Sequence, residues 1–219
     1  MKIKQLKLIS KSKCLVCESK NVKFLFDRKD LIFIKSGLVE LSNRDKICRR
    51  CGYIGSFKHP SQKLLSYYYR SKIVYKVDNP DYNLKNQIKF LKKNLHINDD
   101  ILEIGSGTNF LYDAMRELNY KFYVTADIDS SKKKYDAILI NHVLEHVANP
   151  IKFLKDLKVK IKNNGIIIVE VPDIKKLLSV NSKTYFFSSE HIHHFTENSL
   201  KNIFFLAGYN FKFREKKFI

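Results

Sequence analysis

A glycine turn near the middle of the chain constrains the fold more than any other feature. An apolar stretch that reads as a strand leads into Glu103, Gly105 and Gly107, and a helix-like run follows at 110–115. Glycines let a backbone pass close to a ligand, and the first N–H groups of a helix are free to bind it. The pattern predicts a strand, a turn and a helix that hold a nucleotide-like molecule. A tight turn alone also needs glycines, and Asn109 stands where a dinucleotide fingerprint has its third glycine.

The segments that follow the turn continue the alternation of strand and helix. Residues 122–126 read as a second strand that ends at Asp127, roughly 20 residues beyond the turn, where a carboxylate can accept ribose hydroxyls. Residues 135–147 contain a further buried strand, an amphipathic helix follows, and 165–171 read as the next strand. This order predicts an α/β protein.

The succession of motifs resembles the class I S-adenosylmethionine-dependent methyltransferases over about residues 84–211. The resemblance implies a Rossmann-like sheet and S-adenosylmethionine as the cofactor. It also implies that Asp127 binds the ribose hydroxyls and that Asn141 and His142 border the cofactor at the end of the fourth strand. The remaining cofactor contacts that it implies lie in the glycine turn: Glu103, Gly105, Ser106 and Gly107.

One part of this family's pattern is missing from the chain. Residues 130–135 alone separate Asp129 from Asp136, and this stretch is too short for the helix and third strand that relatives place here. We therefore predict a reduced sheet without its third strand, which lies at an edge in this family. The loop after that strand normally contacts adenine, so a relative that has lost cofactor binding and catalysis is an alternative.

Two CxxC pairs near the N-terminus form the second strong motif. Each pair makes a knuckle that can direct two sulfurs at one tetrahedral Zn²⁺, and 22–26 and 31–34 read as strands between the knuckles. Disulfides or redox pairs are the alternatives, but the first residues lack the apolar segment of a secretory signal, which predicts a cytoplasmic protein. The predicted ligands of one structural zinc ion are Cys14, Cys17, Cys48 and Cys51.

The cysteine pairs also resemble one branch of these methyltransferases, which acts on nucleotide-activated sugars and carries an N-terminal four-cysteine zinc module. In that branch a Glu-His pair followed by Phe is implicated in deprotonating the acceptor, and Glu190, His191 and Phe195 match it. The resemblance implies His191 as general base with Glu190 orienting it. The secondary candidates for the base are His142 and His146.

Other interpretations of this late segment stay open. A metal site built from His191, His193 and His194 is one rival, and a polar cluster that caps the next helix is another. Thr196 is suited to cap a helix over 197–207. Residues 211–219 read as a single further strand.

The charge balance of the chain suggests an anionic partner. The formal net charge is +19, from 41 Lys and Arg against 22 Asp and Glu, and the lysines are spread along the whole sequence. No apolar run is long enough to span a membrane. A zinc-containing RNA-binding protein or RNA methyltransferase is therefore an alternative to a methyltransferase of nucleotide-sugars or other surface-polysaccharide precursors.

The predicted organisation has three parts. A zinc-ribbon-like module covers 1–60, an aromatic linker or lid covers 61–83, and the methyltransferase domain covers 84–219. The linker contains three consecutive tyrosines, Tyr67, Tyr68 and Tyr69, which can stack on a sugar or base or pack in the core.

Overall fold

The computed structural model describes residues 4–5, 8–34, 37–71, 82–107, 109–126, 128, 131–175 and 190–210. The chain divides into two compact units, each assembled from several segments. Unit 1 comprises 1–73, 144–154 and 171–213, and unit 2 comprises 74–143, 155–170 and 214–219. The domain boundaries at residues 60 and 83 stay a prediction. No helix in the described part of the chain has the length and apolar character that a membrane crossing requires.

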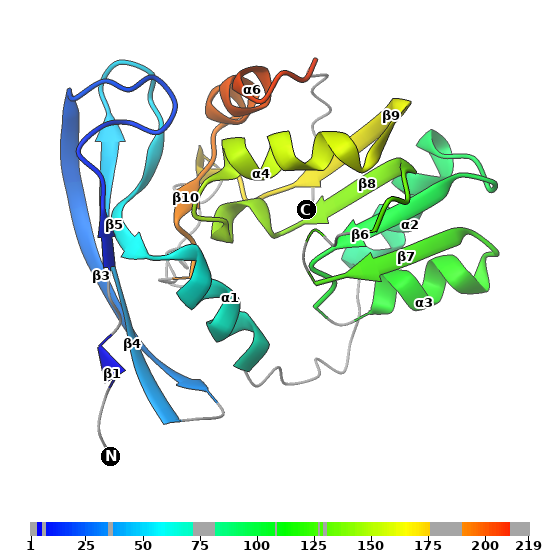
Figure 1. Cartoon of the computed structure of the whole chain (residues 1–219), viewed down its shortest axis with the longest axis horizontal. Helices are drawn as coiled ribbons and strands as arrows, with labels where there is room; N and C mark the ends of the chain where they lie inside the picture. Colours follow the sequence, from blue (N-terminus) through cyan, green and yellow to red (C-terminus); the bar gives the residue numbers. More distant parts are fainter. Residues whose placement is uncertain are drawn as a thin grey trace. The chain divides into compact units, whose positions relative to one another are not determined.

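Unit 2 contains a four-stranded parallel sheet in the order β7-β6-β8-β9 (Figure 1). Its strands are β6 (Asp100–Ile104), β7 (Lys121–Thr125), β8 (Tyr135–Asn141) and β9 (Ile161–Glu170). Parallel neighbours need crossover connections, and the strands are rich in buried Ile and Leu as such sheets require. The predicted α/β class with a parallel, Rossmann-like sheet is confirmed.

Helices of unit 2 cover the sheet through one apolar core. These helices are α2 (Tyr82–Asn94) and α3 (Phe110–Glu117); unit 2 also contains the short η2 (Leu157–Val159), whose residues are not part of this core. Apolar residues recur at helical spacing in α2 and α3, so one stripe of each helix faces the strands. The buried core residues are Leu91, Leu95, Ile101, Leu111, Met115, Tyr120, Phe122, Ala137 and Leu139.

The connection between β7 and β8 is short, as predicted. Its described residues, 126, 128 and 131–134, form no strand, so β7 is an edge of the described sheet. Lys133 ties this connection to the sheet, because its Nζ lies 3.1 Å from an Asp100 carboxylate oxygen and 3.5 Å from the Tyr123 ring centroid. Asp127 and Asp129 lie outside the described residues.

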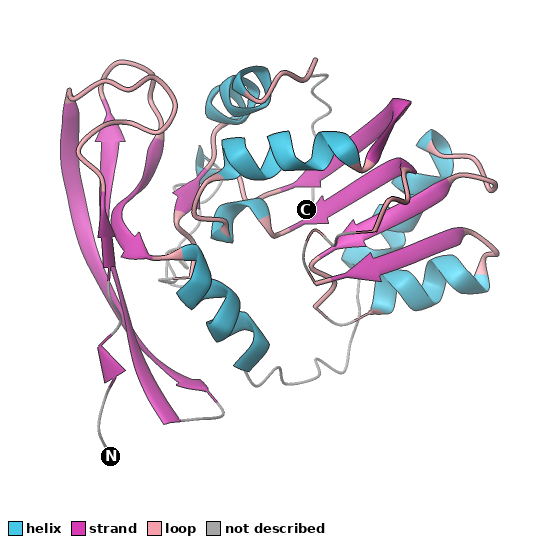
Figure 2. Cartoon of the chain, in the orientation of Figure 1, coloured by secondary structure: helices cyan, strands magenta, loops and turns pink. Residues whose placement is uncertain are grey.

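Unit 1 contains a six-stranded sheet; Figure 2 draws its strands, like all described strands, in magenta. Its central path is β1-β4-β5-β10, with β2 paired to β5 and β3 paired to β4. The strand from the late Glu-His segment therefore belongs to the same sheet as the strands of the cysteine module. The six strands are β1 (Lys4–Gln5), β2 (Leu8–Ser10), β3 (Val22–Ile34), β4 (Gly37–Cys48), β5 (Ile54–Pro60) and β10 (His193–His194).

The two short strands predicted at 22–26 and 31–34 are one continuous strand, β3. The charged residues between them interrupt the apolar pattern, which caused the wrong prediction. Cross-strand pairs compensate this charge: Arg28 binds Asp45 in the interior, and Arg44 donates to Asp27 at the surface. An antiparallel partner with opposite charges lets a polar segment stay in a strand.

The helices that lie or begin in unit 1 are α1 (Gln62–Ser71), η1 (Leu144–His146), α4 (Pro150–Asp156) and α6 (Glu197–Leu206). Thr196 caps α6 as predicted, because its side chain accepts from the Ser199 N–H and Ser199 bonds back to the Thr196 backbone. Gly208 follows the helix with a φ of 78°, the left-handed conformation that glycine adopts without strain. The strand predicted over 211–219 lies outside the described residues.

Candidate functional site

The two glycines of the turn after β6 have different structural roles. Gly105 has a φ of 80°, and a Cβ atom built on it would lie 2.5 Å from Val143 Cγ2. Gly107 has no such φ, and a Cβ atom there would meet nothing within 4 Å among the described atoms. Packing and backbone conformation therefore require glycine at 105, whereas the space beside Gly107 is open at the start of α3.

Glu103 is buried at the end of β6, directly before the turn. Its side chain is 5% exposed, and its Oε1 accepts a hydrogen bond of 3.1 Å from Asn141 Nδ2 at the end of β8. Its Oε2 is buried and has no hydrogen-bond partner in the described part of the chain. Burial raises the pKa of Glu103, although the hydrogen bond from Asn141 and the nearby Ser106 hydroxyl oppose the shift. A buried carboxylate oxygen of this kind needs a donor.

Ser106 also organises the start of α3. Its Oγ donates to Asn109 Oδ1 at 3.1 Å and accepts from the Asn109 N–H at 3.2 Å. Asn109 has a φ of 60°, so it closes the turn in the left-handed conformation that Asn tolerates better than most residues. Thr108 lies outside the described residues.

His142 follows β8 in a strained backbone conformation, with a φ of 51°. Its N–H donates to the Glu170 carbonyl at the end of β9, and its half-exposed ring has Nε2 3.7 Å from Glu170 Oε1. A cleft of about 80 Å³ lies beside these strand ends, lined in part by Gln87, Asn141 and Glu170. Left-handed non-glycine residues often mark functional sites, because the surrounding structure must offset the strain.

Unit 2 thus brings together most of the residues predicted to bind the cofactor. Glu103, Ser106, Asn141 and His142 all lie at the carboxyl ends of β6 and β8, where open α/β sheets bind their ligands. Asp127, predicted to bind the ribose hydroxyls, lies outside the described residues.

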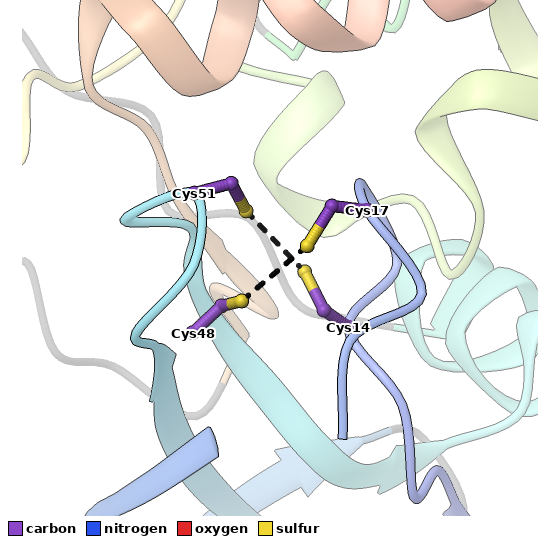
Figure 3. A group of neighbouring side chains, drawn as sticks. All are labelled: Cys14, Cys17, Cys48 and Cys51. Atoms are coloured by element: carbon purple, nitrogen blue, oxygen red, sulfur yellow. Dashed lines mark hydrogen bonds between the residues drawn. The ribbon is translucent and has the colours of Figure 1, made fainter. Parts of the chain in front are cut away.

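The four cysteines of unit 1 converge on one point (Figure 3). All four are free, with Sγ–Sγ distances of 3.6 Å for Cys14 and Cys51 and 3.5 Å for Cys17 and Cys48. Two sulfurs of a tetrahedral zinc site with bonds of about 2.3 Å are about 3.8 Å apart, so the sulfurs fit Zn²⁺. A disulfide needs about 2.04 Å between sulfurs, so the disulfide alternative is wrong.

Local backbone geometry builds the two cysteine knuckles in the same way. The residue after each second cysteine is left-handed, Glu18 with a φ of 55° and Gly52 with a φ of 71°. Each of these residues donates its N–H to the carbonyl of the first cysteine in its pair. Burial raises the pKa of Cys14 to about 11. Burial also acts on Cys48, but N–H groups of Cys51 and Arg50 outweigh it and lower that pKa to about 7. A cation would stabilise four thiolates held this close.

The predicted catalytic pair of unit 1 lies in a polar and aromatic cluster. Glu190 Oε1 accepts a hydrogen bond from the Tyr68 hydroxyl, and Tyr69 Oη lies 2.8 Å from His146 Nδ1. The rings of His146 and His191 are in edge contact, with centroids 4.8 Å apart. Tyr68 is buried, whereas Tyr67 and Tyr69 are partly exposed. The structure therefore brings Glu190, His191 and His146 together.

A buried network fixes the backbone of His191. Arg28 donates to Asp45 through Nε and Nη2, and the same Nη2 donates to the His191 carbonyl at 2.8 Å. Ser56 also donates to Asp45, at 2.6 Å. Burial raises the pKa of Asp45, but the nearby His194 ring and the hydrogen bonds from Arg28 outweigh burial and hold this pKa below its usual value. From the sequence alone, no role was assigned to Arg28 or Asp45. The feature that could have indicated their pairing is the presence of opposite charges within two strand segments.

His193 and His194 have contacts within unit 1, and among the described residues they form no group of metal ligands with His191, so the structure does not support the rival metal site. His193 Nε2 donates to the Val147 carbonyl at 2.7 Å, so its Nδ1 accepts from the Tyr53 hydroxyl. His194 Nε2 lies 3.8 Å from Asp45 Oδ1. Burial lowers the pKa of both imidazoles.

The parallel sheet and the glycine turn with its buried carboxylate define an α/β protein of the nucleotide-binding type. Residues 77–212 match the family model described as a methyltransferase domain. The chain therefore belongs to this methyltransferase family, and the predicted class is confirmed.

Two further kinds of likeness were found. The chain is 32% identical over 75 residues to a tRNA U34 carboxymethyltransferase of Campylobacter jejuni, covering 33% of this chain and 26% of that protein. The chain thus spans about a quarter of the curated relatives it matches. A Thermotoga maritima methyltransferase described as a possible histamine N-methyltransferase has a TM-score of 0.43 at 16% identity, over 58% of this chain and 71% of that one. A putative methyltransferase in complex with the Haloferax volcanii Trm112 activator has a TM-score of 0.46 at 12% identity, over 66% of this chain and 75% of that one.

Proposed function

We propose that the protein transfers the methyl group of S-adenosylmethionine to a small polar acceptor, such as a nucleotide-activated sugar or another precursor of surface polysaccharide. The observation that carries the cofactor part is the buried Glu103 beside the glycine turn, with Oε2 lacking a donor in the described part of the chain. Family membership over 77–212 supports the same reaction class.

The residues at the strand ends fit such a cofactor. Gly107 leaves space beside the backbone, and Glu103 offers an acceptor to an ammonium or hydroxyl group. Asn141 and His142 border the same strand ends. When bound, S-adenosylmethionine supplies a methyl group already activated on a sulfonium. The task of the protein is then to align the acceptor and, for a hydroxyl, to promote loss of its proton.

The cluster of Glu190, His191 and His146 is our candidate for promoting this proton loss. The imidazole is the side chain whose ordinary pKa is suited to proton transfer near neutral pH. The hydrogen bond from Tyr68 holds the Glu190 carboxylate, and the bond from Arg28 holds the His191 backbone. Fixed geometry of this kind is what acid–base catalysis requires.

The net charge of +19 favours an anionic acceptor. The experiment is calorimetry with S-adenosylhomocysteine, followed by binding of UDP- and GDP-sugars in the presence of that product. Saturable binding of S-adenosylhomocysteine with a measurable heat is the expected result. Absence of cofactor binding to the folded, zinc-loaded protein would favour the non-catalytic alternative.

A second candidate function is methylation or binding of RNA. The match to a tRNA U34 carboxymethyltransferase over 75 residues and the positive charge favour it. The two functions separate by their salt dependence, because a protein that neutralises several phosphates loses affinity steeply as salt rises. Affinity for tRNA that exceeds affinity for nucleotide-sugars at physiological salt would support the RNA function.

A further inference from the structure

A second group of possible metal ligands lies in unit 1, apart from the four cysteines. It consists of Glu145 and His146 in η1 and His191 just before β10. One ligand atom from each of these residues lies within 4.8 Å of the others. The Ile192 N–H donates to the Glu145 carbonyl at 2.8 Å, so the two segments that carry the ligands are joined by their backbones.

The carboxylate of Glu145 is in an environment that favours a nearby positive charge. The residue is 1% exposed, and its Oε1 lies 4.0 Å from His146 Nε2. Removing a carboxylate from water costs several kcal/mol unless a cation or donors replace the lost solvation. Either a protonated imidazole or a metal ion meets this requirement.

The tautomer of His146 favours a metal ion. Its Nδ1 lies 2.9 Å from the Glu190 carbonyl oxygen, which can only accept, and 2.8 Å from the Tyr69 hydroxyl, which can also accept, so a hydrogen on this nitrogen satisfies both contacts. In the neutral ring, the lone pair of Nε2 then faces the Glu145 carboxylate. A ring nitrogen directed in this way by a backbone carbonyl is the arrangement found in metal-binding histidines.

We propose that Glu145, His146 and His191 bind one divalent first-row transition-metal ion. Two imidazoles and one carboxylate are the ligand set of protein sites that keep open positions for water or substrate. The arrangement differs from the cysteine site, where four thiolates would fill the coordination shell of zinc.

The catalytic consequence rests on the proposed function, whereas metal binding does not. An acceptor oxygen that occupies an open position on the ion would have its pKa lowered, and its proton would pass to solvent. His191 would then act as a ligand in place of a free base. The backbone hydrogen bond from Arg28 to His191 would hold this ligand in position.

The test uses the full chain with its thiolate site loaded with Zn²⁺ and titrated with Co²⁺ alone. Equilibrium dialysis counts the ions, and the absorption spectrum distinguishes nitrogen and oxygen ligands from thiolates, which give intense bands in the near ultraviolet. We expect one Co²⁺ per chain beyond the zinc, without thiolate bands. Circular dichroism checks that each variant is folded.

The matched variants are Glu145→Gln, which keeps the side-chain volume, and His191→Ala. Each should weaken Co²⁺ binding at least tenfold, whereas His96→Ala, an exposed imidazole in unit 2, should leave it unchanged. If His191→Ala does not fold, His191→Asn replaces it. No Co²⁺ beyond the zinc, or binding that survives both Glu145→Gln and the His191 variant, would overturn the proposal. Calorimetry with S-adenosylhomocysteine on the same samples tests the proposed function separately.

Discussion

Substitutions at the two glycines of the turn should separate folding from cofactor binding. At Gly105, the φ of 80° would cost a side chain about 1–2 kcal/mol, since left-handed backbone brings Cβ close to a carbonyl oxygen. The approach of Cβ to 2.5 Å from Val143 adds about 1–3 kcal/mol of overpacking. Gly105→Ala should therefore lower the free energy of unfolding by about 2–5 kcal/mol.

Gly107 should respond differently, because a side chain there meets open space and no left-handed φ. Gly107→Val should change stability by less than about 0.5 kcal/mol, as most surface substitutions do. It should nevertheless weaken binding of S-adenosylhomocysteine at least tenfold, about 1.4 kcal/mol, because the side chain fills space that we assign to the cofactor.

Thermal unfolding followed by circular dichroism measures the first effect, and calorimetry measures the second. For a chain of this length, each kcal/mol corresponds to roughly 2–4 °C in Tm, so Gly105→Ala should lower Tm by roughly 4–20 °C. Gly107→Val should melt within about 2 °C of the parent. A folded Gly107→Val protein that binds S-adenosylhomocysteine with full affinity would show that the turn is structural alone.

Four further predictions concern unit 1. Metal analysis of protein purified without added zinc should give about one equivalent, and Cys17→Ser should reduce its zinc affinity by orders of magnitude. Arg28→Ala should lower the free energy of unfolding in urea by about 3–5 kcal/mol, because it leaves buried Asp45 without its cation. His59 is buried, and burial lowers its pKa from 6.5 to about 4. The stability from keeping its ring neutral is therefore complete above pH 6.5 and falls by roughly 3 kcal/mol as the pH drops towards 4. His191→Ala should spare binding of S-adenosylhomocysteine and slow methyl transfer by about 10²–10⁴-fold.

Matched controls make these outcomes decisive. Arg44→Ala breaks an exposed pair with Asp27 and should change stability far less than Arg28→Ala. Equal losses in the two variants would refute the role of the buried network. His59→Gln should flatten the fall in stability between pH 6.5 and 4, and an unchanged slope would point to other groups. If His191→Ala keeps methyl transfer within a few-fold of the parent, His191 only packs the loop, and His142 or His146 becomes the candidate for the general base.

The parallel sheet and its crossovers were predictable because they rest on local patterns. Buried strands read as apolar runs, and the glycines at 105 and 107 mark a turn between a strand and a helix. The cap at Thr196 was predictable for the same reason, since the Thr hydroxyl and the Ser199 N–H are neighbours in the chain.

The long strand β3 and the strand β10 were not predictable in this way. The charged residues inside β3 are stable because Asp45 and Arg44 on another strand oppose them, and a single-sequence pattern does not contain this pairing. The pairing of His193 with Gly55 joins residues far apart in the chain, so nothing in the local sequence around the histidines indicates a strand. The cluster that contains Glu145 was missed because His191 meets the neighbouring residues Glu145 and His146 only in three dimensions.

The addition of β10 to the sheet of β4 and β5 limits how this protein can be shortened or recombined. A fragment of residues 84–210 would lack β5, so β10 would present an unpaired strand edge, a known site of aggregation. The His191 carbonyl would also lose Arg28 as its donor. The cysteine-bearing strands and the loop before α6 should thus unfold together as one cooperative segment, although more than a hundred residues separate them in the chain. A functional chimera with another methyltransferase would have to exchange both segments at once.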